Sequence, residues 1–196
     1  MTNKPTLLDP PHLLVLFLIL ILAFSAFAPA LQNNFVNWDD PFYVVNNSLI
    51  HQLSWHSVRQ IFSTYILGNY QPLTILHFAV DHHFFGLDPS YYHLTNILLH
   101  LANIVLVYIF ICLLSGRQLI AILTSLFFAL HPMRVESVVW VTERKDVLFA
   151  FFYLLGLIQY LRYLTVHRES KKYIVSTFLC FVLSLFAKPS AISFPL

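Results

Sequence analysis

Long apolar stretches constrain the fold of this chain more than any other feature. The first stretch, residues 13–31, has nearly the ~20 residues that an α-helix needs to cross the hydrocarbon core of a bilayer. Four more stretches follow, separated by short polar turns or a longer connection: 91–114, 118–131, 147–166 and 173–196, the last of which is interrupted after Ala187 by Lys188-Pro189. Only 10% of the residues are charged, whereas soluble domains carry about 25%. The sequence therefore predicts an all-α, polytopic transmembrane helix bundle.

The first apolar stretch has one competing interpretation, a cleaved signal peptide. Lys4 precedes the stretch, and Ala26-Phe27-Ala28 resembles a cleavage site. The stretch is longer than the usual apolar region of a signal peptide, about 7–15 residues, and further apolar stretches follow it. We therefore expect an uncleaved first span.

The connection 32–90 is predicted to be a long extracytoplasmic first loop with short interfacial helices of its own. Ser54 and Ser57 offer N-cap hydroxyls to a helix that follows them. Pro72–Phe85 has helical periodicity, with one apolar face that ends at Phe84, but is too short to span a bilayer. His77 and Asp81 lie four residues apart and share another face of this helix.

The charged residues favour one orientation, with the N-terminus on the cytoplasmic side. This orientation places on the cytoplasmic side the basic residues Lys4, Arg117, Arg162, Arg168, Lys171 and Lys172. The opposite, extracytoplasmic side then receives the acidic residues Asp39, Asp40, Asp81, Asp88, Glu136, Glu143 and Asp146. Because the loop 32–90, the segment 131–146 and Lys188 reach that same side, we expect their charged groups to converge in one site.

The second span is predicted to carry a polar stripe. Its polar residues are spaced three, four and three apart and so share one helix face: His93, Asn96, His100 and Asn103. Polar side chains within a span usually face the bundle interior or a wet cavity. Interhelical hydrogen bonds that hold the bundle together explain this stripe at least as well as catalysis.

The converging charges suit a reaction that needs a base and a group that binds phosphate. Asp39 or Asp40 can take a proton from an attacking hydroxyl. Arg134, Arg144 or Lys188 can bind a phosphate and stabilise the charge on a departing one. Two structural alternatives remain open: the acidic pair caps the next helix, and the segment 131–146 is a loop held by internal ion pairs.

Other functional classes have less support. The net charge of +2 is too small to indicate a nucleic-acid partner. Oxygen and imidazole ligands for a divalent metal exist in the first loop, but no spaced ligand set such as HExxH or CxxC is present, so a metal remains unsupported. The potential ligands are Asp39, Asp40, His77, Asp81, His82 and His83.

Five motifs, in order along nearly the whole chain, resemble one known family. They are Trp38-Asp39-Asp40, Tyr70-Gln71-Pro72-Leu73-Thr74, the segment from Tyr92 to His100, the segment from His131 to Val141 with Glu143-Arg144-Lys145-Asp146, and Lys188-Pro189. The chain resembles the membrane part of the transmembrane and tetratricopeptide-repeat proteins related to protein O-mannosyltransferases, in the GT-C glycosyltransferase superfamily.

The resemblance implies a polytopic glycosyltransferase with a GT-C-like fold. Such an enzyme would transfer a mannose-like sugar from a polyprenyl-phosphate donor, dolichyl- or undecaprenyl-linked, to a hydroxyl acceptor on a protein or glycan. No cofactor is implied with certainty beyond that donor. The active face would be the extracytoplasmic face of the bacterial inner membrane or the ER membrane, with membrane lipid around the chain.

The resemblance also assigns roles to residues of this sequence. Asp39 and Asp40 match the acidic pair of the first external loop, whose carboxylate acts as base while the anomeric centre inverts. Arg134 and Glu136 match the second external motif, and Lys188 matches a later lysine near the lipid phosphate. Together with three further residues of the site, the expected substrate-binding set is Arg134, Glu136, Arg144, Lys188, His100 and His131. Pro189 departs from the family, because animal members more often have an acidic residue there.

Two features set this chain apart from complete family members. No tetratricopeptide repeats are present, and the chain stops within an apolar stretch at Leu196. We therefore expect residues 1–196 to be the amino-terminal part of a longer GT-C-like domain. A non-catalytic multi-pass scaffold, or a truncated inactive fragment, is the alternative function. A transporter is disfavoured because the acids lie at one interface rather than at the bilayer midplane.

Overall fold

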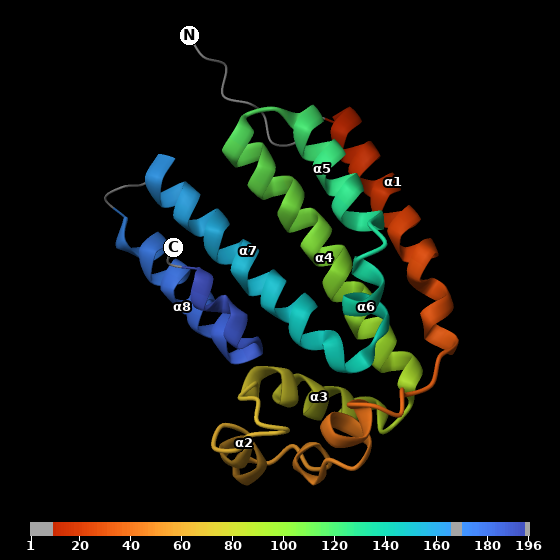
Figure 1. Ribbon diagram of the computed structural model, residues 1–196. Coiled ribbons are helices and arrows are strands. Elements are labelled where there is room, and N and C mark those ends of the chain that lie inside the picture. Colours follow the sequence, from red (N-terminus) through yellow and green to blue (C-terminus); the bar gives the residue numbers. More distant parts are fainter. Residues whose placement is uncertain (1–9, 166–169, 195–196) are drawn as a thin grey trace.

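The computed structural model describes residues 10–165 and 170–194. Long helices lie side by side, and a layer of short helices and turns covers one end of them (Figure 1). Within the described residues the regular structure is helical, apart from one isolated bridge between Ile66 and Asn69. The prediction of an all-α membrane helix bundle is confirmed.

Five longer helices form the bundle. They are α1 (Pro10–Phe27), α4 (Pro89–Ser115), α5 (Gln118–Leu130), α7 (Arg144–Thr165) and α8 (Lys171–Ala187). Three segments are long and apolar enough to cross a membrane, by length and composition: Pro10–Gln32, Pro89–Ser115 and Val141–Thr165. The chain is therefore a membrane protein. That all five predicted spans cross the membrane stays a prediction.

The last helix is interrupted where the sequence predicts. The break expected in the fifth stretch at Lys188-Pro189 is present, because α8 ends at Ala187 and a 3₁₀ turn, Pro189–Ser193, follows. Lys188 has extended backbone, with φ of −153°, and Pro189 lacks the N–H that would continue the helix. After this break the chain returns along the bundle, and the Phe194 ring contacts Tyr153 of α7, with 4.9 Å between ring centroids. Residues 195–196 lie outside the described part.

The helix α4 is capped at both ends and buries its polar stripe. The Asp88 side chain caps its start by accepting a hydrogen bond of 3.0 Å from the Ser90 backbone N–H. Gly116 ends it with a φ of +66°, a left-handed conformation that favours glycine. All four residues of the predicted stripe are buried, and α4 packs on α5 and α7. The stripe thus faces the bundle interior, as polar groups in a span should.

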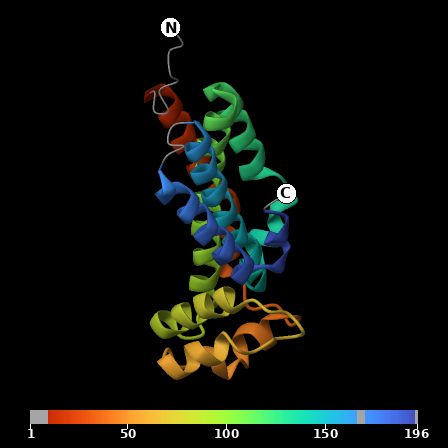
Figure 2. The same cartoon turned by 90° about the vertical axis from the view of Figure 1, so that its left-hand side faces the viewer.

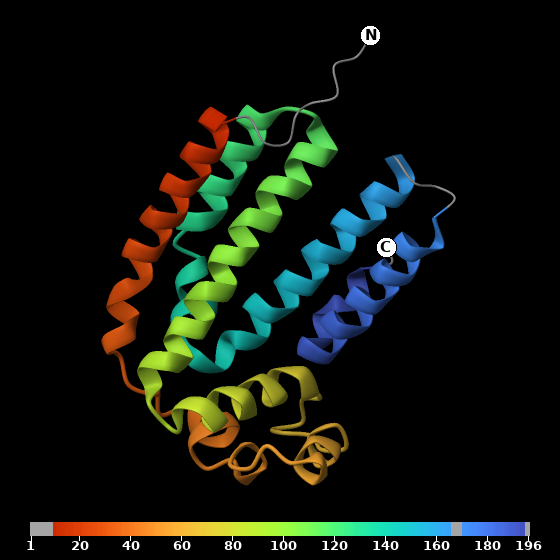
Figure 3. The ribbon, with the colours of Figure 1, turned by 180° about the vertical axis from the view of Figure 1, so that it is seen from behind.

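The layer across the bundle end comes from the loop 32–90 (Figures 2 and 3). It contains α2 (Trp55–Ile61), capped by the Ser54 hydroxyl as expected, and α3 (Pro72–Phe85), whose bounds match the prediction. Two faces of α3 differ in burial, since Phe84 on the predicted apolar face is 70% exposed while Phe78 on another face is fully buried. The helix packs against α4, α7 and α8 through its buried face, and its position in the membrane interface stays a prediction.

A short helix links the bundle to this layer. α6 (Arg134–Val139) follows α5 and is joined to α7 by a 3₁₀ turn, Val141–Glu143, so the segment 131–146 lies at the covered end of the bundle (Figure 1). The end of α7 and the start of α8 lie away from the covered end (Figure 1). Lys4 and Arg168, which the orientation argument uses, lie outside the described residues.

Candidate functional site

Charged and polar residues from three parts of the sequence meet at the covered end of the bundle. The first loop contacts the segment after α6 through Asp40, α3 contacts the start of α7 through Asp81, and the end of α8 contacts it through Lys188. The predicted convergence of the loop 32–90, the segment 131–146 and Lys188 is therefore present in the structure.

The carboxylate of Asp40 is bound by structural contacts within the protein. Its fully buried carboxylate accepts hydrogen bonds from the Val36 N–H (2.7 Å), the Trp140 indole N–H (3.1 Å), and the backbone N–H (3.1 Å) and hydroxyl of Thr142. Although Asp40 occupies the cap position of the turn Pro41–Val45, its side chain makes no capping bond there. Asp40 thus attaches the first loop to the segment that joins α6 and α7.

Asp39 has a different environment, although it is the next residue in the chain. It is partly exposed, and its carboxylate makes no hydrogen bond or ion pair with residues 10–165 or 170–194, while its backbone carbonyl accepts from the Phe42 and Tyr43 N–H groups. Asp39 also lies close enough to the phenol of Tyr43 to affect that group electrostatically. Of the predicted acidic pair, Asp39 is the carboxylate that remains available for a substrate.

Arg144 is fully buried among residues of α3 and α4. Its guanidinium forms an ion pair with Asp81 and donates to the Asn96 side-chain oxygen (2.8 Å) and the Tyr92 carbonyl (2.7 Å). The same group lies 4.7 Å from the centroid of the Phe78 ring, in cation–π geometry. Each nitrogen of the guanidinium has a protein partner, so this conformation leaves none for a substrate phosphate.

His77 completes the cluster around Arg144. Its Nδ1 lies 3.3 Å from an Arg144 Nη, and because arginine only donates, this Nδ1 is the acceptor of a neutral imidazole. Burial, and then the nearby Arg144 charge, lower the pKa of His77 to about 4. The predicted shared face of His77 and Asp81 is therefore the face that binds Arg144.

Arg134 contrasts with the other basic residues at this end. Lys145 pairs with Glu143 at 2.7 Å, and Lys188 pairs with Asp146, which also accepts a hydrogen bond of 3.2 Å from the Ser137 hydroxyl. Within the described residues Arg134 has no carboxylate partner; its guanidinium lies 4.8 Å from the centroid of the Phe128 ring. Of the four basic residues that α6, the start of α7 and the end of α8 bring together, Arg134 alone is free to bind an anion.

The other expected substrate-binding residues have varied surroundings. Glu136 is exposed on α6. His131 ends α5 and accepts a hydrogen bond of 3.2 Å from the Met133 N–H through Nδ1. His100 is buried between helices, with Nε2 3.1 Å from the Ala129 carbonyl. His100 therefore serves helix packing in this conformation, and its substrate role, like the other assigned roles, stays a prediction.

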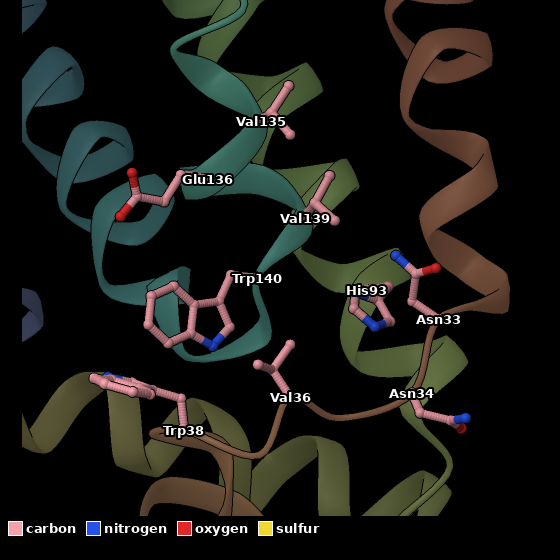
Figure 4. Close-up of a pocket in the computed structure, with 9 residues that line it drawn as sticks. All are labelled: Asn33, Asn34, Val36, Trp38, His93, Val135, Glu136, Val139 and Trp140. Atoms are coloured by element: carbon pink, nitrogen blue, oxygen red, sulfur yellow. The ribbon is translucent and has the colours of Figure 1, made fainter.

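An open groove of about 540 Å³ lies between the first loop and α6. Trp38 and Trp140 lie on one side of it and His93 with Asn33 on the other, with Val36 between them (Figure 4). The residues that line it are Asn33, Asn34, Val36, Trp38, His93, Val135, Glu136, Val139 and Trp140. Trp38, which lines the groove, directly precedes Asp39 in the chain, but Asp39 itself is not a lining residue.

No group of three or more histidine, cysteine or acidic side chains placed to bind a metal occurs in the described ranges 10–165 and 170–194. Among the six potential ligands, Asp81 and His77 contact Arg144, and Asp40 contacts Thr142 and Trp140.

Sequence reasoning missed the two distant partners of the Asp40 carboxylate. Trp140 and Thr142 hold the first loop in place, although neither was expected to act in the site. The presence of Trp140 in one of the quoted motifs was the available signal. Residue spacing cannot reveal a contact between positions about one hundred residues apart. The sequence therefore contained no signal for the role of Thr142.

Comparisons with known proteins give a consistent set of relatives. The chain is 32% identical to human protein O-mannosyl-transferase TMTC4 over 174 residues, which cover 76% of this chain and 23% of the relative. It is 32% identical to human TMTC1 over 149 residues (68% and 16%) and 36% identical to Xenopus laevis tmtc2 over 115 residues (59% and 13%). No family model and no solved structure matches the chain. The chain spans less than a quarter of the length of these curated relatives.

Proposed function

The chain belongs to the TMTC family of protein O-mannosyl-transferases, and from this premise we propose that it contains part of a glycosyltransferase site. The proposed reaction moves a mannose-like sugar from a polyprenyl phosphate to a hydroxyl group of a protein. The single observation that carries the proposal is that, within residues 10–165 and 170–194, the charged groups of Asp39 and Arg134 have no ion-pair or hydrogen-bond partner, whereas Asp40, Arg144, Lys145 and Lys188 have partners.

Asp39 is the proposed general base. It would take the proton of the acceptor hydroxyl as the oxygen attacks the anomeric carbon, and the bond between that carbon and the phosphate oxygen would break. Products are the glycoside, polyprenyl phosphate and a proton held on Asp39. Asp40 would hold Asp39 in place through its bonds to Trp140 and Thr142.

Arg134 is the proposed group that binds the donor phosphate. A guanidinium binds phosphate oxygens with charge-assisted hydrogen bonds and stabilises the charge on the departing phosphate. Arg134 and Trp140 stand at the two ends of α6, about 9 Å apart along the axis at ~1.5 Å per residue. Lys188 lies at the same end of the bundle, and release from Asp146 would let it assist.

The test compares sugar transfer by variants of the full-length protein, supplied with a polyprenyl-phosphate sugar and an acceptor polypeptide. Asp39→Asn should lower turnover by about 10²–10⁴-fold at saturating donor, because a positioned base contributes about that much. Arg134→Ala should recover part of its activity at high donor concentration, because the lost contact serves binding as well as the transition state. Asp88→Asn, which removes an exposed carboxylate of the same layer, is the matched control and should retain activity.

Two outcomes would change the assignment. If Asp39→Asn transfers sugar at the unmutated rate while folded Asp40→Asn is inactive, the base is Asp40. If Asp39→Asn and Arg134→Ala are both folded and fully active, the charged groups only hold the bundle together and the chain acts as a scaffold.

The active face of this site is proposed to be extracytoplasmic. In the structure the layer 32–90 and the start of α8 lie at opposite ends of the bundle (Figure 1). A cysteine at exposed His56 should react with an impermeant thiol reagent added to the extracytoplasmic side, and a cysteine at exposed Lys171 should be protected. Cys112 and Cys180 are buried, so the background should be low. The reverse labelling pattern would invert the orientation.

A further inference from the structure

A small cavity lies beside Arg134 and shares no lining residue with the groove. Its volume is about 10 Å³, which is the space of about one water-sized probe. Its walls come from four helices: α4, α5, α6 and α7. Its polar lining includes Asn103, Arg134, Ser137 and Asp146.

Two polar atoms of this lining are buried and unsatisfied. Neither Arg134 Nε nor Asn103 Oδ1 has a hydrogen-bond partner within the described residues. Asn103 itself is only 1% exposed, and its amide nitrogen is fixed by donation to the Val147 carbonyl at 2.8 Å. A buried donor or acceptor without a partner destabilises the fold, so two such atoms on residues that line one cavity call for a shared partner.

The two atoms are chemically complementary. Arg134 Nε carries a hydrogen and can only donate, while Asn103 Oδ1 can only accept. They therefore need a molecule that accepts one hydrogen bond and donates another. We propose that one ordered water molecule binds in this cavity and bridges Arg134 Nε–H to Asn103 Oδ1.

The other lining residues fit a water molecule as well. The water has a second hydrogen to donate, and Asp146 and the Ser137 hydroxyl oxygen are acceptors in the same lining. Buried waters typically make about three hydrogen bonds. A metal cation is excluded by the positive charge of Arg134, and an apolar ligand would leave both polar atoms unsatisfied.

The bridging water gives Asn103 a role in the site, and this part of the inference rests on the proposed function. Because the water fixes Nε on the inner side of Arg134, the two Nη groups keep one direction for binding an anion. Asn103 is then a positioning residue that acts on the donor phosphate through the water and Arg134. The last member of the α4 polar stripe thereby connects the bundle interior to the site.

The water itself can be detected without any sugar-transfer assay. In the full-length protein, labelled with ¹⁵N-arginine and placed in lipid nanodiscs, the Arg134 Nε–H resonance should show a cross-relaxation peak to a long-lived water. Arg134→Lys identifies the resonance, and Asn103→Leu should abolish the water peak. Absence of a water peak at Arg134 Nε–H in the unmutated protein would overturn the proposal, whatever the enzyme's activity.

A double-mutant cycle supplies a second measurement. Arg134→Met and Asn103→Leu should each lower the melting temperature by about 2–4 °C, and the double variant should lose little more, because either change removes the bridge. Arg134→Met combined with Thr177→Val, which removes a hydrogen bond on α8 (Thr177 hydroxyl to the Tyr173 carbonyl, 2.9 Å), is the matched control and should be additive. Additive losses in the first cycle would contradict a shared water.

The positioning role has its own readout. Asn103→Leu should raise the donor KM about fivefold, the equivalent of one hydrogen bond of ~1 kcal/mol, with kcat changed by less than about twofold. If the water peak is present and the donor KM of Asn103→Leu is unchanged, the water is structural and the positioning role is wrong. If no variant or unmutated protein transfers sugar, the proposed function fails while the water site stands on the resonance alone.

Discussion

The regions around Arg144 and Arg134 use the same side chain in opposite ways. The guanidinium of Arg144 is fully buried and bound by Asp81, Asn96 and Tyr92. Arg134, ten positions earlier, has an aromatic neighbour and an unsatisfied Nε but no carboxylate in the described part of the chain. A buried charge with complete partners fixes structure, whereas a charge left without a counterion can bind one that arrives with a substrate. The two residues of the acidic pair differ in the same way: the Asp40 carboxylate is bound within the protein, and the Asp39 carboxylate is available to a substrate.

The largest expected effect is on stability in the Arg144 region. Arg144→Met should lower the free energy of unfolding by about 3–5 kcal/mol, because it leaves the Asp81 carboxylate buried without its counterion. The matched change Arg134→Met should cost only about 1 kcal/mol, since it removes a cation–π contact and one hydrogen-bonding group. Equilibrium unfolding in mixed micelles measures both. Equal losses would remove the contrast between the two regions.

Asp40→Asn should have the next largest effect. The amide replaces an oxygen that accepts from Val36, or from Trp140 and Thr142, and the charge that strengthens these bonds is lost. Hydrogen bonds to charged groups contribute about 1.5–3 kcal/mol each, so we expect a loss of about 2–3 kcal/mol. Asp39→Asn should stay within about 0.5 kcal/mol, as for other surface changes. The same unfolding assay decides, and a larger loss for Asp39→Asn would reverse the assignment of the pair.

The remaining effect is a gradual pH dependence that belongs to the Arg144 region. His77 has a pKa of about 4 in the folded protein, against an ordinary value near 6.5. Between these two values the unfolded chain binds the proton and the folded protein does not, so stability falls as pH drops from about 6.5 to 4. The slope from this one group is at most ~1.4 kcal/mol per pH unit. Unfolding measured across this range should show a flatter profile for His77→Gln, and an unchanged profile would mean that His77 titrates normally.

The sequence predicts local features well in this protein because the signals are local. The bounds of α3 follow from Pro72 and Gly86, and the start of α2 follows from the Ser54 hydroxyl. The shared face of His77 and Asp81 follows from their spacing of four residues. That Arg144 binds to this face cannot be predicted from spacing. The family resemblance identified the charged segments of the candidate site. The structure was needed to show which of their charged residues have protein partners and which remain available.

The rest depends on contacts between distant segments. Nothing local distinguishes Arg134 from Arg144 or Asp39 from Asp40, since each pair lies in one segment with similar neighbours. Burial by α3 and α4 separates the arginines, and the bond to Thr142 separates the carboxylates. The end of α8 is the intermediate case. Pro189 gave the local signal for the predicted break, but the return of the chain along α7 depends on packing of Phe194 on Tyr153.

The attachment of Asp40 also sets an order of assembly. Its bonds to Trp140 and Thr142 join residues 100 and 102 positions apart, so during synthesis at about 5–20 residues per second the carboxylate waits roughly 5–20 s for its partners. Helix hairpins such as α4 with α5 need only a short turn and can form as soon as both helices emerge. The layer over the bundle end must therefore close late, after the start of α7 has been made. Until then Asp40 stays hydrated outside the bilayer, where its charge opposes slippage of the first loop into lipid.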